Sequence, residues 1–391
     1  MPDRAEPVPR MSWAQACARR LDRHALSAPP ADADPAGIVA AICGAHAQVL
    51  TAAQWSIGLR LAGGTRGDVE AALWTGRSLV KTFGPRGTVH LLPARDLPMW
   101  TAALSAVPSA PNSFPEAVGL TPGQKDAVIG AISDALLQAE LTLDELTDAV
   151  VARTGSWAGD LVLPAFGGRW PRWRQALPGA GMSGVLCFGP SRGRKVTYTS
   201  PRRWLPGFRP AAPEPALAEL VRRYLSAYGP ATPAAFAQWL GAPRRWAAGL
   251  FGSLSGQLQQ VELAGAAAWL PAGDAAAPPA PPGGIRLLPY VDPYVVACQP
   301  RELLFPGRAA GRALSRTGQA GTFPVLLIDG TAGGVWHQRR SGRKLDITVE
   351  PLARLAASQR RELDGQVERL GEFLGAEPRL TIGPVTVGSH A

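Results

Sequence analysis

The sequence predicts an α+β protein in which helices followed by a β-hairpin recur along the chain before a smaller module ends it. Two segments carry nearly the same hairpin tip, FGPRG at residues 83–87 and FGPSRGRK at residues 188–195, and this internal echo indicates repeated units. A stretch rich in proline and alanine, residues 274–284, separates the units from a C-terminal part with a different pattern. The 391 residues, 46% hydrophobic and 18% charged, suffice for several folded domains.

The first unit is expected at residues 11–110. Helices are predicted over residues 14–26, from residue 35 to residue 44, and over residues 65–74, because the apolar positions recur at helical spacing and proline or threonine stands at the start. Residues 78–93 have two β-rich arms around a Gly-Pro tip and are predicted to form a hairpin. Helices followed by such a hairpin describe a winged helix.

The second unit, residues 115–212, repeats this order. Helices are predicted at residues 122–138 and 142–153, a helical or irregular region at 170–177, and hairpin arms at 184–188 and 196–200. The expected outcome is a second winged-helix unit whose wing is strongly basic.

The third unit, residues 213–274, follows the same plan with a different tip. Its helices are predicted at residues 216–227, 232–240 and 243–254, and its hairpin arms at residues 261–265 and 267–273. The tip carries no basic residue, so we expect this unit to be structural and the first two wings to face a polyanion.

After the linker at residues 274–284 the pattern changes to a small α/β module at residues 285–391. Strands are predicted at residues 285–290, 324–328, 345–349 and 380–387, and one amphipathic helix is predicted at residues 353–374. The predicted fold is therefore three tandem winged-helix units followed by a C-terminal module in which helix and strands are mixed.

Positive charge is concentrated in one part of the chain. The net charge is +10, and between residues 161 and 213 there are nine arginines or lysines and no aspartate or glutamate. Tryptophans interleave with these basic residues, which is typical of phosphate contacts along a nucleic acid; a solvated basic face is the alternative. The candidate DNA-binding residues are Lys81, Arg86, Arg192, Arg194, Lys195, Arg202, Arg203, Arg339 and Arg340.

Residues 65–74, the candidate recognition helix, offer few side chains that could read base edges. We therefore expect binding to double-stranded DNA that follows its shape and is largely independent of its sequence.

Residues 35–59 contain no charged side chain, but a membrane span is rejected because polar groups such as His46 and Gln48 would need partners in hydrocarbon. The segment is expected to be buried in the protein. The N-terminus has no signal-peptide pattern, and the four widely spaced cysteines are expected to be buried, reduced thiols. We expect a cytoplasmic protein, nucleoid-associated when bound to DNA, with no metal, no cofactor and no required protein partner.

Several segments resemble one known family. They are GAHAQVLTAAQWSIGLRL, RSLVKTFGPRGTVHLLPARDLPMW, VRRYLSAYGPATPAAFAQWL, IRLLPYVDPYVV and PVLLIDGTAGGVWHQRR, which together cover nearly the whole chain. They resemble the winged-helix family that contains the AlkZ and YcaQ DNA glycosylases. The resemblance implies three winged-helix units around a concave DNA channel, with a catalytic motif of Gln, an apolar residue, then Gln or Asp.

At the motif position this chain has His46, Ala47 and Gln48, so histidine replaces the first glutamine. The resemblance implies hydrolysis of the N-glycosidic bond of N7-alkylguanine-type lesions in damaged duplex DNA, including bulky or crosslinking adducts. Such an activity would serve base excision repair or self-resistance to genotoxins. His46 and Gln48 are the expected catalytic residues.

The spacing of these two residues has a structural requirement. On a helix they would point about 200° apart, whereas in an extended chain they share one face while Ala47 turns inward. A helix that ends near Gly44 would allow this. Because an N7-alkylated guanine is already cationic, the enzyme mainly has to place a water molecule. A neutral imidazole can accept a proton from that water while the Gln48 amide orients it, or either side chain can stabilise positive charge that develops on the sugar. The lack of an obvious lysine near the motif argues against Schiff-base chemistry.

Other interpretations remain open from the sequence. His46 and Gln48 could be satisfied polar groups that tie a helix to a hairpin, and His90 is interpreted as a packing histidine. Asp292 and Asp346 match the family in context and are given no chemical role. A non-enzymatic DNA-binding protein, such as a regulator or an architectural factor, is the main alternative function, and a scaffold for a protein partner is the third.

Overall fold

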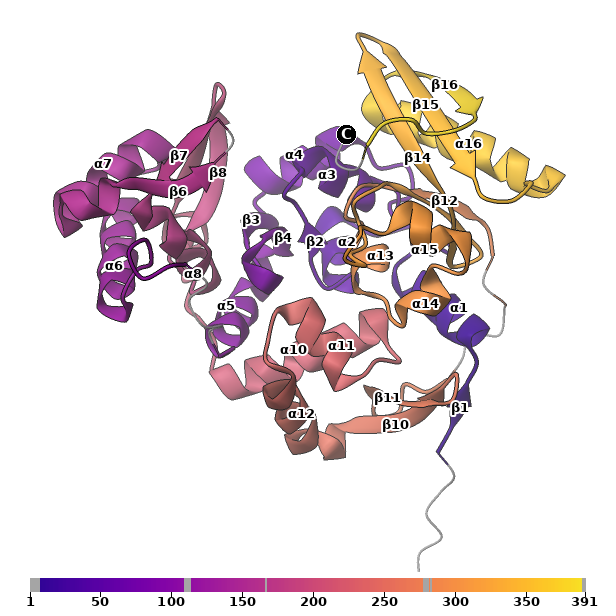
Figure 1. Cartoon of the computed structure of the whole chain (residues 1–391), viewed down its shortest axis with the longest axis horizontal. Coiled ribbons are helices and arrows are strands. Elements are labelled where there is room, and N and C mark those ends of the chain that lie inside the picture. The colour runs from indigo at the N-terminus through magenta and orange to yellow at the C-terminus, as the bar shows by residue number, and fades with distance from the viewer. Residues whose placement is uncertain (1–7, 109–113, 166, 277–280, 282, 389–391) are drawn as a thin grey trace, which may run out of the picture. The chain divides into compact units, whose positions relative to one another are not determined.

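The computed structural model describes residues 8–108, 114–165, 167–276, 281 and 283–388 and shows an α+β protein with several small sheets (Figure 1). The chain forms two compact units. Unit 1 contains Met1–Glu70, Val221–Trp239 and Arg244–Ala391, and unit 2 contains Ala71–Leu220 and Leu240–Pro243. Part of the predicted linker, residues 277–280 and 282, lies outside the described residues.

Unit 1 begins with short helices, of which the first two have capping side chains at their starts. Its N-terminal helices are α1 (Trp13–Arg23), α2 (Pro35–Ala41) and α3 (Leu50–Gly58). Helix α4 (Arg66–Trp74) follows them and continues into unit 2 from Ala71. Ser12 and Gln15 form a capping box at α1, and the Asp34 side chain accepts a hydrogen bond from Gly37 N at the start of α2. The predictions of α1, α2 and α4 are confirmed, with α2 ending three residues before Gly44.

A helical and hairpin region in the middle of the chain provides an aromatic core. It comprises α10 (Pro213–Tyr228), α11 (Pro233–Leu240), α12 (Arg244–Ser253), β10 (Leu258–Leu263) and β11 (Ala266–Pro271). These bounds confirm the three helices and the hairpin predicted there. The structure adds β1 (Arg10–Met11), which pairs in parallel with β10. Two residues at the start of the chain carry too little pattern to predict a strand.

The C-terminal module is a five-stranded sheet in the order β12-β13-β14-β15-β16. The strands are β12 (Ile285–Leu288), β13 (Val325–Ile328), β14 (Thr331–Ser341), β15 (Lys344–Pro351) and β16 (Glu377–Ile382). The pairs are antiparallel except β15 with β16, and α16 (Ala357–Leu374) crosses from β15 back to the edge (Figure 1). Short helices α13 (Pro293–Ala297), α14 (Arg301–Leu304) and α15 (Arg308–Ala313) lie between β12 and β13.

β14 was not predicted as a strand, although it has 11 residues. Its first half contains Gly333 and Gly334, which disfavour a strand by propensity. At Gly334 the neighbouring strand comes so close that a β-carbon would lie 2.3 Å from the carbonyl oxygen of Glu350. Glycine is therefore required there by packing, which a propensity argument cannot anticipate.

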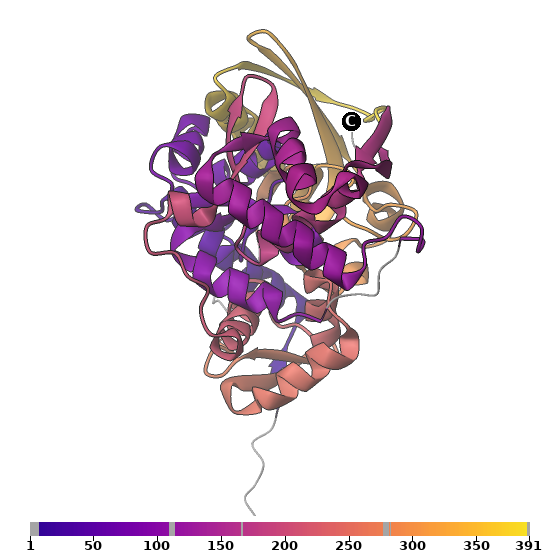
Figure 2. The same cartoon turned by 90° about the vertical axis from the view of Figure 1, so that its left-hand side faces the viewer.

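Unit 2 is built from two long helices and three hairpins. Its elements are β3 (Leu79–Phe83), β4 (Val89–Pro93), α5 (Leu97–Ser105), α6 (Pro122–Gln138), β5 (Leu141–Thr142), α7 (Leu143–Thr154), β6 (Leu161–Ala165), β7 (Gly168–Pro171), α8 (Leu177–Met182), β8 (Cys187–Arg192), β9 (Lys195–Thr199) and α9 (Pro201–Trp204). In Figure 2, α6 and α7 lie on the face of unit 2 that is turned toward the viewer. Helix α6 has the predicted bounds, and α7 begins and ends one residue later than predicted. Thr121 and Thr142 form the capping boxes at their starts.

Two predictions for unit 2 need correction. The region around residues 170–177 was expected to be helical or irregular, but its first part is a strand of the β6–β7 hairpin, followed by a 3-10 turn at Arg172–Ala176 and by α8. The prolines and paired glycines of residues 161–171 hide the strand pattern. The second hairpin also extends further than expected, because β8 and β9 continue into residues 189–195, the predicted tip.

Candidate functional site

The segment that carries His46 and Gln48 leaves helix α2 through a left-handed turn. Cys43 has φ +51° and Gly44 has φ +93°, and Gly44 N donates a hydrogen bond of 2.9 Å to Val39 O. Glycine adopts such a φ without a steric penalty. The chain then becomes extended, with β2 at Ala45–His46. The predicted end of the helix before Gly44 is confirmed.

The side chains of residues 45–48 alternate in exposure. Ala45 and Ala47 are fully buried, His46 is half-buried and Gln48 is exposed. Val49 follows with 41% of its surface exposed, and helix α3 begins one residue later. Over residues 45–48 this alternation is that of an extended chain in which Ala45 and Ala47 enter the core. It agrees with the prediction that Ala47 turns inward between the two polar side chains.

A buried tyrosine holds the start of this turn. The Tyr228 hydroxyl donates a hydrogen bond to Ile42 O, the carbonyl that precedes Cys43. Arg20 in turn donates to Tyr228 O at 3.1 Å and to Pro230 O at 3.0 Å. Burial holds the pKa of Tyr228 well above its ordinary value, so the hydroxyl remains a donor. The start of the motif turn is thus held by Tyr228, a residue 186 positions away from Ile42 in the sequence.

A second buried network lies behind α3, the helix that follows the motif. Arg60 donates to both carboxylate oxygens of Asp292, at 2.8 and 2.9 Å, and the Ser56 hydroxyl donates to the same carboxylate at 2.6 Å. Both ionised side chains are fully buried. Burial alone would raise the pKa of Asp292, but Arg60 and the hydrogen bonds outweigh it and leave the pKa below its ordinary value. Asp292 therefore has a structural role in joining α3 to the C-terminal module.

The predicted basic residues of the first hairpin lie in different settings. Lys81 on β3 is half-buried, with its Nζ 4.7 Å from the centre of the Phe188 ring. Burial lowers the pKa of Lys81. Arg86 is exposed at the tip, where it has φ +60°. His90 is buried, with Nδ1 2.9 Å from Thr88 O, which agrees with its interpretation as a packing histidine.

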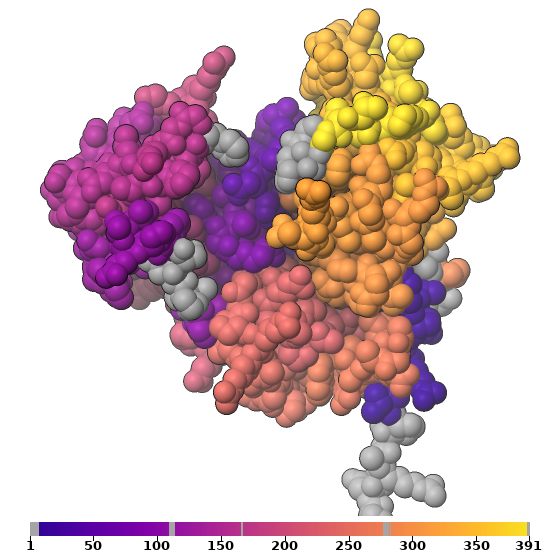
Figure 3. All heavy atoms as spheres, viewed as in Figure 1, coloured from indigo at the N-terminus to yellow at the C-terminus, as the bar shows by residue number. Residues whose placement is uncertain are grey.

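The β8–β9 hairpin projects from the surface of unit 2, as Figure 3 shows, and carries three predicted contacts. Two of the three already have acidic partners on α7. Arg192 forms an ion pair with Glu145, and Lys195 Nζ lies 2.8 Å from Asp144. Arg194 is exposed at the turn. The charge of this hairpin is therefore partly balanced within unit 2.

The other predicted contacts are exposed arginines on separate elements. Arg202 and Arg203 lie on α9 in unit 2. Arg339 and Arg340 lie on β14 in unit 1, where Arg340 donates to Gly342 O and Leu374 O, both at 3.1 Å. In unit 2 these exposed arginines lie on the short helix that follows the β8–β9 hairpin, and in unit 1 they lie on the β14–β15 hairpin.

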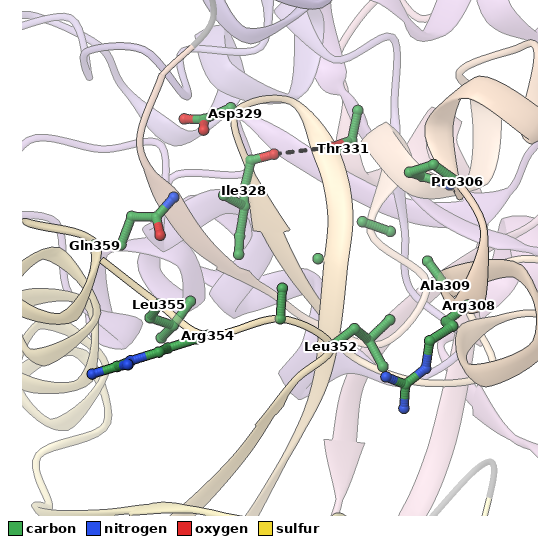
Figure 4. Close-up of a pocket in the computed structure, with 13 residues that line it drawn as sticks. Pro306, Arg308, Ala309, Ile328, Asp329, Thr331, Leu352, Arg354, Leu355 and Gln359 are labelled. Atoms are coloured by element: carbon green, nitrogen blue, oxygen red, sulfur yellow. Dashed lines mark hydrogen bonds between the residues drawn. The ribbon is translucent and has the colours of Figure 1, made fainter. Parts of the chain in front are cut away.

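One surface pocket of about 500 Å³ lies on the C-terminal module, outside the predicted site (Figure 4). Leu352, Leu355 and Ile328 give it apolar walls, and Arg308 and Arg354 stand at its edges. None of the predicted catalytic or DNA-binding residues lines it.

Three further observations concern metals, thiols and membranes. In the part of the chain that the structure describes, no three His, Cys, Asp or Glu side chains gather in a group that could hold a metal ion. All four cysteines are buried, as predicted, and burial raises the pKa of Cys298 to about 11. No helix among the described ranges has the length and apolarity to cross a bilayer.

Comparison with known proteins agrees with the resemblance seen in the sequence. The family model described as DNA glycosylase AlkZ-like matches residues 39–373, which include the motif, α3 and most of the C-terminal module. The chain belongs to the AlkZ-like DNA glycosylase family. An AlkZ-like relative from Streptomyces sahachiroi, named interstrand DNA cross-link repair glycosylase, is 32% identical over 339 residues, covering 83% of this chain and 88% of that protein.

The fold of this AlkZ-like protein also matches a solved structure. Streptomyces sahachiroi DNA glycosylase AlkZ superposes with a TM-score of 0.80 at 27% identity, covering 96% of this chain and all of that one. The match confirms the mixed α+β architecture with small sheets.

The sequence did not predict the buried residues whose hydrogen bonds and ion pair hold the motif turn and helix α3. Tyr228 lies at the end of an amphipathic helix and Arg20 on the basic side of α1, so each was expected to fill an ordinary helical position. Arg60 gave a signal that could have been used, since it is the first charged residue after the uncharged segment and a buried charge requires a partner. Its partner, Asp292, could not be identified without the fold.

Proposed function

We propose that this chain is a monofunctional DNA glycosylase that hydrolyses the N-glycosidic bond of alkylated bases in duplex DNA. The proposed substrates are N7-alkylguanine-type lesions and bulky or crosslinking adducts, and the proposed roles are base excision repair or self-resistance to genotoxins. Membership of the AlkZ-like family supports this, as does a relative named for interstrand cross-link repair. We propose that it acts in the cytoplasm, at the nucleoid, because the proposed substrate is DNA.

The proposal also assigns the architecture. We propose winged-helix units at residues 11–110, 115–212 and 213–274, followed by the C-terminal module at residues 285–391. The helix-then-hairpin order in each range supports this assignment. The third hairpin, β10–β11, has no basic residue at its turn, which suits a structural role.

The observation that carries the proposed chemistry is the alternation at residues 45–48. Two alanines enter the core while His46 and Gln48 turn away from it, directly after a left-handed turn that ends helix α2. Gln48 is exposed, unlike the buried structural pair of Arg60 and Asp292 behind α3. An imidazole and a carboxamide two positions apart in an extended chain can address one ligand.

The reaction can be balanced with these two side chains. Alkylation at N7 gives guanine a positive charge, so the electron pair of the C1′–N9 bond leaves with the base and neutralises it. Positive charge develops on the deoxyribose, and the oxygen of a water molecule bonds to C1′. We assign the water proton to the neutral His46 imidazole and the orientation of the water to the Gln48 amide. No general acid is needed, because the leaving group is already activated.

Phosphate contacts are proposed for eight exposed basic residues of the two units and for the half-buried Lys81. They are Lys81, Arg86, Arg192, Arg194, Lys195, Arg202, Arg203, Arg339 and Arg340. Such contacts hold duplex DNA without reading its sequence. A damage-specific enzyme that must find lesions in any sequence context is served by binding of this kind.

A duplex with one N7-methylguanine tests the proposal. After incubation with the protein, abasic sites are converted to strand breaks by an abasic-site endonuclease under mild conditions that leave the alkylated base in place. We expect breaks at the lesion only when both proteins are present. Absence of breaks would count against excision of this lesion class, and breaks without the endonuclease would count against monofunctional chemistry.

A further inference from the structure

The β6–β7 hairpin of unit 2 presents an aromatic side chain to solvent on a basic support. Trp170 on β7 is 41% exposed, and Leu161 at the start of β6 is 60% exposed. The Arg174 guanidinium carbon lies 3.9 Å from the centre of the Trp170 ring. The hairpin forms a sheet of its own, paired with no other strand that the structure describes (Figure 1).

The base of this hairpin is fixed although Trp170 is exposed. Leu163 and Trp173 are buried beneath it, and Trp173 Nε1 donates to the Thr147 hydroxyl at 3.3 Å. Arg172 donates to Ala117 O and Val118 O at 2.9 and 3.0 Å. The exposed indole is therefore carried by a rigid base, which keeps small the entropy lost when a ligand binds to it.

The charge around the hairpin indicates the chemistry of the partner. No acidic residue occurs between residues 161 and 213. Arg169, next to Trp170, is exposed and has no ion-pair partner among the described residues. On the β8–β9 hairpin, by contrast, Arg192 and Lys195 are already paired with carboxylates of α7. Arg169 thus leaves unbalanced positive charge beside the exposed tryptophan, which complements a polyanion.

We propose that Trp170 is a stacking platform for an unstacked base of the DNA, with Arg169 contacting the adjacent phosphate. One ring face of Trp170 rests on Arg174, and a nucleobase has a flat surface of the same kind to lay against an exposed indole. The inference rests on the proposed function, in which DNA is the substrate. It adds a second contact type, because the basic residues assigned above bind phosphate only.

The experiment compares two labelled duplexes that differ in one unpaired, bulged nucleotide and measures the ratio of their affinities by fluorescence anisotropy. The wild-type chain is expected to prefer the bulged duplex. Trp170→Ala should remove that preference, with a loss of roughly five- to 100-fold on the bulged duplex and little change on the paired one. Trp170→Phe, which keeps an aromatic ring, should retain most of the preference and shows that the alanine effect is not a folding defect.

Matched controls come from the same unit. Leu137→Ala removes another exposed apolar side chain, and Arg153→Ala removes an exposed arginine at the end of α7; both should leave the preference unchanged. Arg169→Ala should weaken binding to both duplexes and lower the salt slope by about one.

An affinity ratio that is the same in Trp170→Ala as in the wild-type chain would overturn the inference, including the case in which both ratios equal one. That result would direct attention to a protein partner for the hairpin. The proposed function fails by a different result, the absence of excision by the wild-type chain, so the two failures are distinguished.

Discussion

Replacement of Tyr228 by phenylalanine tests whether the hydrogen bond from Tyr228 positions the segment that carries His46 and Gln48. The change keeps the ring and removes only the hydroxyl that donates to Ile42 O, the carbonyl before the left-handed turn. Loss of one buried hydrogen bond should lower the free energy of unfolding by about 1–2 kcal/mol. A looser turn lets His46 move, and a misplacement of about 1 Å costs up to about 100-fold in rate, so we expect excision to slow at least tenfold.

The neighbouring Tyr224 provides a matched control. It is also fully buried, its ring centre lies 5.3 Å from that of Tyr228, and its hydroxyl has no hydrogen-bond partner among the described residues. Tyr224→Phe should therefore leave stability unchanged or raise it slightly. Urea denaturation gives the stability of both variants, and single-turnover excision with a DNA titration separates rate from affinity. Equal behaviour of the two variants, or an unchanged rate in Tyr228→Phe, would refute the reasoning.

Three further predictions follow from buried and paired charges. Asp292→Ala leaves a buried guanidinium unpaired and should cost about 3–5 kcal/mol of unfolding free energy in urea denaturation; a cost below 1 kcal/mol would contradict the buried ion pair. Burial lowers the pKa of His24 to about 3. Between pH 6.5 and pH 3 the unfolded chain therefore binds a proton that the folded chain does not. The free energy of unfolding should fall as the pH falls through this window, by up to about 1.4 kcal/mol per pH unit. His24→Phe should show a shallower fall in urea midpoints between pH 7 and 5, and an equal slope would contradict this. Arg192→Ala with Arg194→Ala should weaken DNA binding and flatten its salt dependence, whereas Glu145→Gln, which removes the carboxylate that pairs with Arg192, should strengthen binding; no change in either titration would exclude this hairpin from the footprint.

Elements with strong local signals could be predicted from the sequence. The bounds of α6 matched because a threonine cap and a first-turn proline mark its start. Helix α3 was missed for the opposite reason: Ala52 to Gly58 are all buried, so the helix has no polar face and no amphipathic period. The β6–β7 hairpin was missed because its prolines and glycines are disfavoured in strands.

The candidate site also has features that could be predicted from the sequence and contacts that could not. The helix end before Gly44 and the inward turn of Ala47 could be predicted, because glycine chemistry and the two-residue period of an extended chain are local properties. The hydrogen bond from Tyr228 to Ile42 spans 186 positions and depends on how α10 packs. The pairing of Arg192 with Glu145 also depends on the fold, so a count of basic residues overstated the free charge of the β8–β9 hairpin.

The central claim is that His46 and Gln48 act on the substrate rather than support the fold. Single-turnover excision of N7-methylguanine from duplex DNA, measured beside DNA affinity, tests it most directly in His46→Ala and Gln48→Ala, with Val49→Ala as the exposed neighbouring control. We predict a rate loss of about 100-fold or more in the first two variants with affinity nearly unchanged, and no effect in the third. Parallel losses of rate and affinity, or wild-type rates in either motif variant, would contradict the account.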